Sequence, residues 1–371
     1  MIIADGHFNP LGLCRSLGKA DMRPDVVVVD GEGSVITKSK YPKSIAHVEN
    51  NAQAVDYVLK HFSSTDKKTF LMTGSDKTIA EIDRRYNEIS PYFITYNCGA
   101  QGEINRFMSK ALQNRLASAA GLKVPDYEEV NVGDLPQHVD YPIITKAVDS
   151  RVPGWKSQVH ICNNEAELKE AYTQLHTPRI LLQHYVAKKN ETGFNGISIN
   201  HGKDVYLPLQ LSYYSTEVDT FGNSIYLFRP TDDDLVQKVK KLIKSTGYEG
   251  SFSVDFIIGE DNEIYFLEIN FRNSGWAYPY TNAGVNLPAI WVKSMLTGRL
   301  ETDDVKIKRL PYSAIVDLWE VSAQMKRGWR AGLKSMWQTL ISDSYIFWDR
   351  HDTGPFWYIV KGWVKTHILR K

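Results

Sequence analysis

The sequence has few cysteines, no long apolar run and almost no net charge. Its 371 residues include three cysteines, Cys14, Cys98 and Cys162, which lie far apart and form no CxxC pair. This excludes a disulfide scaffold and a zinc knuckle, and the low odd count suits a reducing compartment, so we expect a cytoplasmic protein. No stretch approaches the ~18 apolar residues of a membrane-spanning helix, and the first residues do not resemble a secretory signal.

The overall composition is that of an ordinary folded protein. Hydrophobic residues make up 43%, charged residues 23%, and the formal net charge is +1, which excludes a disordered chain and a collagen-like repeat. At roughly 150 residues per domain, the length predicts two or three domains. The charge is unevenly spread, because residues 326–371 carry nine Lys or Arg against three Asp and also hold five of the nine tryptophans.

The first 104 residues alternate between strand-like and helix-like patterns. Apolar runs at 26–30 and 70–73 are typical of buried parallel strands, and helical patterns follow them at 52–62 and 78–89. This rhythm predicts an α/β domain built on an open parallel sheet.

Two later segments also have helical patterns. Residues 105–120 predict a helix that Gly121 would close as a C-cap, and the segment after Pro311 is expected to be helical and is rich in aromatics. Strands are predicted between them at 142–148, 158–162, 180–186, 196–200 and 205–214.

The most informative segment, residues 251–272, predicts a β-hairpin. Two β-rich apolar runs flank a turn of Gly, Asp and Asn residues. If the turn is centred between Asp261 and Asn262, side-chain alternation places Glu268 and Arg272 on one face. The cross-strand pairs expected on that face are Asp255–Glu268, Ser253–Asn270 and Ile257–Phe266.

Two carboxylates directly opposite each other on a sheet need an explanation. Like charges in this position destabilise the sheet, and a shared proton or a cation would relieve the repulsion. Asp255, Glu268 and the amide oxygen of Asn270 are hard oxygen donors, which suit Mg²⁺ held together with phosphates. Arg272 would lie over the same phosphates and stabilise developing negative charge. The alternative is an amphipathic hairpin with a solvated acidic face.

The hairpin resembles the E-x-N-x-R metal hairpin of the ATP-grasp superfamily. The resemblance extends over about residues 105–298, where further segments are similar to superfamily motifs in the same order. They are Ser109-Lys110, similar to the first nucleotide-binding lysine; Tyr141–Lys146, similar to the YPvivK strand; and Leu182–Val186, similar to the hinge whose backbone reads adenine.

The resemblance implies a set of site residues and cofactors. The cofactors would be ATP and one or two Mg²⁺ ions, for which Mn²⁺ can substitute. Asp255, Glu268 and Asn270 would hold the metal, and Arg272 and Lys146 would act in catalysis. The implied nucleotide contacts are Lys110, Lys146, Gln183, His184, Tyr185, Val186 and Glu191.

Several of these residues have a plain structural alternative. Lys146 and Lys110 would then be solvated surface lysines. Gln183 would bond a neighbouring strand, and Glu191 would pair with a lysine such as Lys188.

The loop after Lys146 departs from the superfamily pattern. Residues 149–157 contain a single glycine where several usually fold over the triphosphate, so fewer backbone N–H groups can approach the phosphates. Arg151 and Lys156 would supply charge instead, which makes Lys156 a further candidate nucleotide contact.

The resemblance also implies a domain order. Residues 1–104 would form a Rossmann-like domain that precedes the ATP-grasp domain at 105–300. The latter would have a lid lobe at about 125–180 and a metal-binding lobe at about 187–300, and 301–371 would be a helical aromatic and basic extension.

The pattern is most similar to carbamoyl-phosphate-synthase-like and D-aspartate-ligase-like carboxylate–amine ligases. This implies that a small carboxylate is activated as an acyl phosphate and joined to an amine, such as an amino acid on a cell-envelope or secondary-metabolite substrate. The alternatives are an enzyme that phosphorylates bicarbonate and carbamate, and a nucleotide-binding regulatory or membrane-surface module without turnover.

The basic, Trp-rich tail has three interpretations. Its aromatics can pack onto the core while the basic residues stay in water, or the segment can lie peripherally on the inner face of a membrane. Stacking on nucleic-acid bases is the third, and we expect no nucleic-acid partner. The sequence does not predict an oligomeric state.

Overall fold

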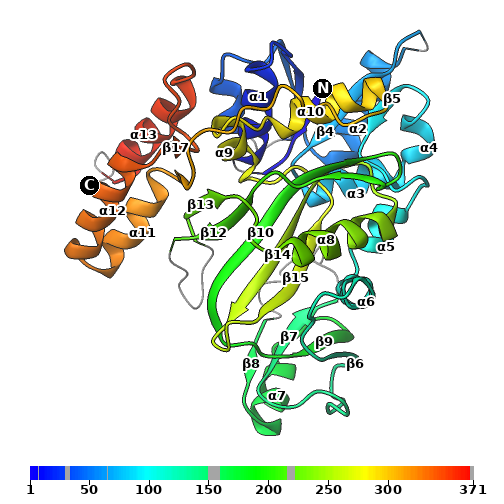
Figure 1. Ribbon diagram of the computed structural model, residues 1–371, viewed down its shortest axis with the longest axis vertical. Coiled ribbons are helices and arrows are strands. Elements are labelled where there is room, and N and C mark those ends of the chain that lie inside the picture. The colour runs from blue at the N-terminus through cyan, green and yellow to red at the C-terminus, as the bar shows by residue number, and fades with distance from the viewer. Residues whose placement is uncertain (7, 30–33, 65, 149–158, 215–221, 368–371) are drawn as a thin grey trace.

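The computed structural model describes residues 1–6, 8–29, 34–64, 66–148, 159–214 and 222–367. In this part of the chain the strands form three sheets, which follow one another from top to bottom in Figure 1. The N-terminal sheet lies at the top, a long curved sheet runs through the middle, and a small sheet lies at the bottom.

The N-terminal sheet is parallel and has the order β3-β2-β1-β4-β5, which confirms the predicted α/β class. Its strands are β1 (Ile2–Ala4), β2 (Asp25–Val29), β3 (Ser44–Val48), β4 (Thr69–Thr73) and β5 (Phe93–Thr95). Its helices are α1 (Asn9–Gly18), α2 (Asn51–Phe62), α3 (Asp76–Arg84), α4 (Tyr86–Ile89) and α5 (Glu103–Phe107). The patterns at 26–30 and 70–73 correspond to β2 and β4, while the short strands β1, β3 and β5 were not anticipated.

The small sheet is antiparallel, has the order β6-β9-β7-β8, and lies in the part of the chain predicted to form the lid lobe. Its elements are β6 (Tyr127–Asn131), β7 (Ile143–Ala147), β8 (Ile161–Cys162), β9 (Arg179–His184) and the helix α7 (Glu165–Tyr172). Its buried residues, among them Ile143, Leu168 and Leu182, form a hydrophobic cluster of their own.

The middle sheet has the order β15-β14-β10-β12-β13-β16-β17, with β11 paired to β10. Its strands are β10 (Lys188–Ile199), β11 (Asp204–Tyr206), β12 (Gln210–Tyr213), β13 (Ser224–Phe228), β14 (Gly250–Gly259), β15 (Ile264–Asn270), β16 (Tyr312–Ile315) and β17 (Ser344–Tyr345). The helices that accompany it are α6 (Lys110–Ala120), α8 (Asp233–Thr246), α9 (Ala277–Asn282) and α10 (Leu287–Thr297).

The middle sheet and the N-terminal sheet share one hydrophobic cluster, unlike the small sheet. Trp291 of α10 is fully buried and joins the two, because its ring lies 5.5 Å from that of Phe70 and 5.0 Å from that of Tyr96. The two upper layers therefore form one packed body, and the small sheet hangs from it with a separate core.

Two predicted elements are interrupted. The helix expected at 105–120 is divided between α5 and α6, because the Ser109 side chain accepts a hydrogen bond from the Leu112 N–H and starts a new helix at Lys110. The chain after Pro311 begins with a strand rather than the expected helix, and both β16 and β17 join the middle sheet. A domain boundary at residue 300 would separate them from that sheet. The helices of the tail are α11 (Trp319–Arg327), α12 (Trp329–Ile341) and α13 (Gly354–His367).

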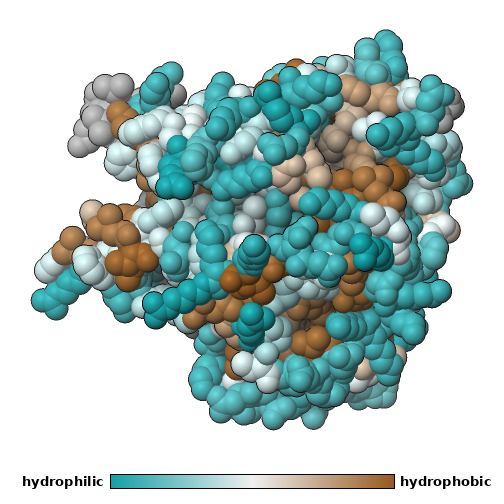
Figure 2. Space-filling view, turned by 45° about the horizontal axis from the view of Figure 1, so that its top comes forward, coloured by the Kyte–Doolittle hydropathy of each residue, from teal (hydrophilic) through white to brown (hydrophobic). Residues whose placement is uncertain are grey.

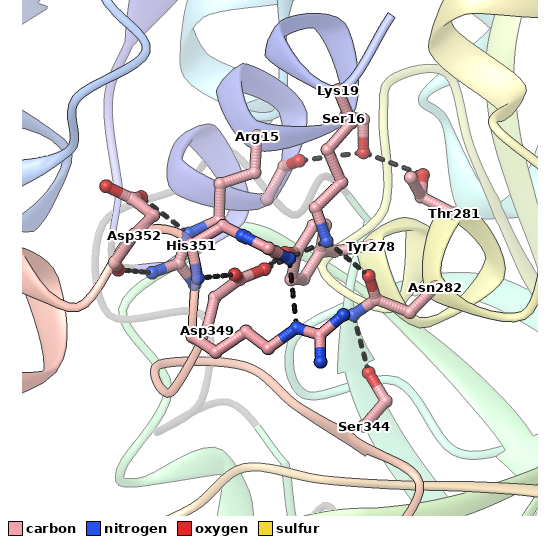
Figure 3. Close-up of polar contacts among 12 residues, drawn as sticks. Arg15, Ser16, Lys19, Tyr278, Thr281, Asn282, Ser344, Asp349, His351 and Asp352 are labelled. Carbon is pink, nitrogen blue, oxygen red and sulfur yellow. Dashed lines mark hydrogen bonds and ion pairs between the residues drawn. The ribbon is translucent and has the colours of Figure 1, made fainter.

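Residues 343–352 are held against α1 by a buried polar network, the C-terminal anchor (Figure 3). Arg15 is fully buried, and its guanidinium donates to the Asp352 carboxylate at 2.8 Å and to the carbonyls of Ile346, Phe347 and Asp352 at 2.7–3.0 Å. Beside it, Lys19 forms an ion pair with Asp349 at 2.8 Å. The beginning and the end of the described chain are thus joined by paired charges.

Within the described residues, none of the helices combines the length and apolar character that a bilayer span requires.

Candidate functional site

The hairpin β14–β15 has the predicted register at its acidic end. Asp255 lies opposite Glu268, and Ser253 lies opposite Asn270. The expected Ile257–Phe266 pair is wrong, because the register shifts by one residue beyond Asp255 and Ile257 pairs with Tyr265. A β-bulge of this kind adds a residue to one strand and bends it. The shift lies between the acidic pair and the turn, so the Asp255–Glu268 and Ser253–Asn270 pairs keep the predicted register.

Asp255 and Glu268 share one amide donor. The Nδ2 group of Asn270 donates to the Asp255 carboxylate at 3.1 Å and to that of Glu268 at 3.3 Å. Burial and the nearby negative charge of Glu268 together raise the pKa of Asp255 to about 8. Asp255 therefore tends to keep its proton unless a positive charge binds beside the pair.

Glu191 and Gly193 of β10 lie beside the acidic pair. Gly193 lies opposite Asp255, and a Cβ at Gly193 would come within 2.7 Å of the Val254 carbonyl oxygen and 3.0 Å of the Asp255 carboxylate. Glycine is therefore needed to make room for that carboxylate. Glu191 forms an ion pair with Lys188 at 2.8 Å, the alternative considered from the sequence, and its charge also contributes to the raised pKa of Asp255.

Two lysines face the acidic pair from other elements. Lys110 is the first residue of α6, and its Nζ lies 4.0 Å from the Glu268 carboxylate. Lys146 on β7 donates to the Gln183 side chain at 2.6 Å. Burial and the positive charge of Lys110 together lower the pKa of Lys146 to about 7, although the charge of Glu268 opposes the shift. Neighbouring lysines repel each other, and a polyanion such as a triphosphate would relieve that repulsion.

Gln113 holds the helix of Lys110 against the strand of Glu268. Its side chain donates to the Ile269 carbonyl at 3.0 Å and accepts from the Ile269 N–H at 3.1 Å. β15 is an edge strand of the sheet, so these backbone groups would otherwise lack a strand partner. One buried amide thus fixes the spacing between a candidate phosphate ligand and a candidate metal ligand.

Arg272 links the hairpin to the N-terminal sheet. Its guanidinium donates to the Asn270 side-chain oxygen at 3.3 Å and to the Asp76 carboxylate at 3.0 Å. Asp76 begins α3 directly after β4, which neighbours β1 at the centre of the parallel sheet. The order of the chain reverses between these two strands, and ligands of open α/β sheets bind at such a point.

The hinge residues use their backbone N–H groups within the lid lobe. The His184 N–H donates to the Asp126 carbonyl and the Tyr185 N–H to the Pro142 carbonyl, both at 2.8 Å. Neither group can read an adenine edge without giving up that bond, so the nucleotide roles of His184, Tyr185 and Val186 stay predictions. The Gln183 side chain accepts a hydrogen bond from Lys146 on the neighbouring strand β7, which is the structural alternative considered for it, and its nucleotide role stays a prediction.

The donor set fits a hard divalent cation. No three His, Cys, Asp or Glu side chains of the described residues group as a metal cluster, so the protein would offer two carboxylates and the Asn270 amide. In the structure the NH₂ end of that amide faces the carboxylates, and a half-turn of the amide would present its oxygen instead. Two acids, an amide oxygen and the space left by Gly193 suit Mg²⁺ bound with phosphate oxygens.

The structure thus brings most of the predicted residues to one place. Asp255, Glu268, Asn270, Arg272 and Lys110 lie within one polar cluster, with Lys146, Gln183 and Glu191 beside it. Lys156, Arg151 and the rest of the glycine-poor loop lie outside the described residues.

Sequence reasoning missed three residues that shape the site: Asp76, Gln113 and Gly193. An acid directly after a parallel strand was a signal for Asp76, because ligands gather at that edge of a sheet. Gln113 lies one helical turn after Lys110, and this spacing, which puts both on one side of a helix, was the signal for it. Nothing in the sequence pointed to Gly193.

Comparison with known proteins identifies the same superfamily. A family model described as "ATP-grasp in the biosynthetic pathway with Ter operon" matches residues 229–316, which include the hairpin. The N5-carboxyaminoimidazole ribonucleotide synthase of Staphylococcus aureus (strain COL) is 28% identical over 175 residues, 44% of this chain and 46% of that protein. The chain therefore matches about half the length of such curated relatives.

Solved structures show the same fold. Biotin carboxylase from Campylobacter jejuni has a TM-score of 0.65 at 15% identity, covering 82% of this chain and 73% of that one. L-amino acid ligase from Bacillus licheniformis has a TM-score of 0.62 at 14% identity, covering 82% and 76%. The hairpin motif, the family model and the solved structures therefore agree: the chain has the ATP-grasp fold, and its hairpin region is similar to the family that this model describes.

Proposed function

We propose that the protein is an ATP- and Mg²⁺-dependent, ADP-forming ligase that joins a carboxylate to an amine. The observation that carries the proposal is the pair Asp255–Glu268 with Lys110 within 4.0 Å of one of its carboxylates. Acids facing acids beside lysines are a costly arrangement in an empty site, and a metal–triphosphate complex would satisfy both kinds of charge at once.

The chain's own residues would divide the chemistry as follows. Lys110 and Lys146 bind phosphate oxygens, and Asp255, Glu268 and Asn270 hold the metal, which neutralises charge on the phosphates. The substrate carboxylate attacks the γ-phosphorus and ADP leaves; the amine then attacks the acyl phosphate and phosphate leaves. Arg272 stabilises the negative charge of the acyl phosphate, and the lid lobe excludes water.

The amine acceptor is proposed to bind between the hairpin and the C-terminal edge of the N-terminal sheet. The Arg272–Asp76 ion pair spans this junction. Asn273 next to it has a buried side-chain oxygen without a hydrogen-bond partner, although its Nδ2 donates to Asn9 at 2.9 Å. A polar substrate group would supply the missing donor.

Bicarbonate is the first carboxylate to test. The curated relatives are named for a product that carries a carboxyl group on an amine nitrogen, whereas the L-amino acid ligase shares the fold alone. An amino-acid carboxylate is the second candidate. A carbamoyl-phosphate-type reaction would differ in its product, because it transfers a second phosphoryl group to the carbamate.

The test is ADP release with bicarbonate, then with pooled amino acids, each against a panel of amines. Glu268→Gln serves as the blank, and Glu263→Gln is its matched control, because Glu263 lies on the same hairpin and pairs with Lys123 at its exposed end. We expect substrate-dependent ADP release that Glu268→Gln abolishes and Glu263→Gln preserves. Hydroxylamine trapping would detect the acyl phosphate formed from an amino acid.

A binding module without turnover gives a different result. Calorimetry would then show tight Mg²⁺–ATP binding to the wild-type chain, with no ADP formed across the panel. That outcome would overturn the ligase proposal while leaving the site in place. The low cysteine count predicts a cytoplasmic protein, and its substrates would then be small soluble molecules.

A further inference from the structure

The C-terminal helix α12 exposes a continuous apolar surface. Its members, which we call the α12 face, follow the first one at offsets of 4, 7, 8, 11 and 12 positions and so share one side of the helix. They are Trp329, Leu333, Met336, Trp337, Leu340 and Ile341. Leu340 is 74% exposed and both tryptophans are 64% exposed. An apolar surface of this kind marks an interaction site.

The packed side of α12 has the opposite character. Gly332 and Ser335 are buried, and a Cβ at Gly332 would collide with the Met325 side chain of α11. The helix therefore packs through its small residues and turns its large apolar residues outward. A helix pair that folded around its own core would do the reverse.

The surroundings of the α12 face are basic. Lys326, Arg327, Arg330 and Lys334 lie in α11 and α12, while the one acidic residue of these two helices, Glu320, is buried and accepts from the Gln324 side chain at 3.0 Å. A second copy of this chain would bring the same positive charges together, which opposes self-association. An anionic surface would complement them.

The geometry points to an anionic lipid bilayer as the occupant. We propose that α12 lies in the plane of a membrane surface, with its apolar face among the acyl chains and its basic residues at the headgroups. Tryptophan favours this boundary because its ring is apolar and its N–H is polar. At about 1.5 Å per residue, the 13 residues of α12 would lie along roughly 20 Å of surface.

The position of α12 allows this contact without blocking the site. Figure 1 shows α11 and α12 projecting from the left side of the molecule, away from the small sheet at the bottom. On that side, Figure 2 shows apolar side chains at the outer edge of the projection. Trp348 packs against Phe356 of α13 with ring centroids 5.1 Å apart but is itself 37% exposed, so this contact lies within the tail.

The first test is sedimentation of the full chain with vesicles, without nucleotide. We expect binding to vesicles of equal parts phosphatidylglycerol and phosphatidylcholine, and much weaker binding to phosphatidylcholine alone. Trp337→Ser with Leu340→Ser should reduce the partition coefficient roughly tenfold or more, since two apolar groups no longer enter the bilayer. Leu296→Ser is the matched control, because Leu296 is an exposed leucine of α10 outside the face, and it should bind like the wild type.

The second test asks whether the tryptophans enter the lipid. Vesicles with brominated acyl chains should quench the fluorescence of the wild type, and Trp329→Phe with Trp337→Phe should bind equally well but show less quenching. Failure to bind anionic vesicles would overturn the proposal. So would a salt-resistant dimer, measured by analytical ultracentrifugation, that Trp337→Ser with Leu340→Ser dissociates, because the face would then belong to a second copy.

Discussion

The C-terminal anchor and the candidate site are both partly buried clusters of charged residues, and they are built in opposite ways. In the C-terminal anchor each buried charge meets its opposite, as Arg15 does with Asp352 and Lys19 with Asp349. In the candidate site Asp255 faces Glu268 across a strand pair, and burial together with the charge of Lys110 lowers the pKa of Lys146. The anchor pairs opposite charges throughout, whereas the site also places like charges next to each other, which fits the proposed binding of a metal and phosphates.

The pKa values of two aspartates, Asp349 in the anchor and Asp255 in the site, show the difference most directly. Burial favours the neutral form of Asp349, but hydrogen bonds from Lys19 and Tyr278 outweigh it and lower the pKa of Asp349 to about 2. Burial and the charge of Glu268 raise the pKa of Asp255 to about 8. A carboxyl pKa that is raised by burial and like charge is typical of a functional site. A carboxyl pKa that is lowered by an ion pair and hydrogen bonds is typical of a structural contact.

The largest expected effect separates activity from stability. Asp255→Asn should reduce ADP formation by about a thousandfold or more, because a metal ligand is lost, while the free energy of unfolding in the absence of metal does not fall. Steady-state ADP release and urea unfolding would measure the two. If Asp255→Asn kept its turnover and lost stability, Asp255 would have a structural role like the charged residues of the anchor.

The anchor should respond in the opposite sense. Arg15→Met leaves the buried Asp352 carboxylate without its cation and should lower the free energy of unfolding by about 3–5 kcal/mol. Turnover per folded molecule should stay within about twofold, since Arg15 contacts no site residue. Arg15→Met with Asp352→Leu should recover part of the stability, and a double variant as unstable as the single one would contradict the charge argument.

A pH series should sharpen the comparison in metal-free protein. The folded chain keeps Asp255 protonated up to about pH 8, while the unfolded chain ionises it above the ordinary value of 3.8. The wild type therefore loses stability relative to Asp255→Asn as pH rises from about 4 to about 8, and the difference is then constant. Thermal unfolding in a chelator at pH 4, 7 and 9 would show it, and a difference in melting temperature between the two proteins that stays the same from pH 4 to pH 9 would refute the raised pKa.

The smallest expected effect concerns the side chain that positions the site. Gln113→Leu removes both bonds to the Ile269 backbone and should cost about 1–3 kcal/mol of stability. Turnover should fall roughly tenfold, because the spacing between Lys110 and Glu268 is no longer fixed. Gln101→Leu is a suitable control, since Gln101 is an exposed glutamine that accepts a single backbone bond from Asn87. A loss of stability without any loss of turnover would limit Gln113 to a structural role.

What could be predicted from sequence depended on how local the signal was. The acidic pair follows from strand alternation within one hairpin, so its register was predictable. The lysines came from the superfamily resemblance, and the break at Ser109 that brings Lys110 to the start of a helix was not foreseen.

The contacts that could not be predicted join distant parts of the chain. Gln113 meets a residue 156 positions away, and Asp76 meets one 196 positions away. Gly193 matters through the strand beside it, which only the fold brings there. The bulge beyond Asp255 escaped prediction because a shift of one residue leaves no trace in an apolar run.

The separation within the anchor has a consequence for how the protein is made. Arg15 meets Asp352 across 337 positions, so during synthesis its guanidinium has no carboxylate partner in the native arrangement until the ribosome has almost finished the tail. At about 5–20 residues per second this delay is roughly 20–70 seconds. The first helix therefore cannot reach its final surroundings early, and nascent chains cut before residue 346 should remain sensitive to protease around α1.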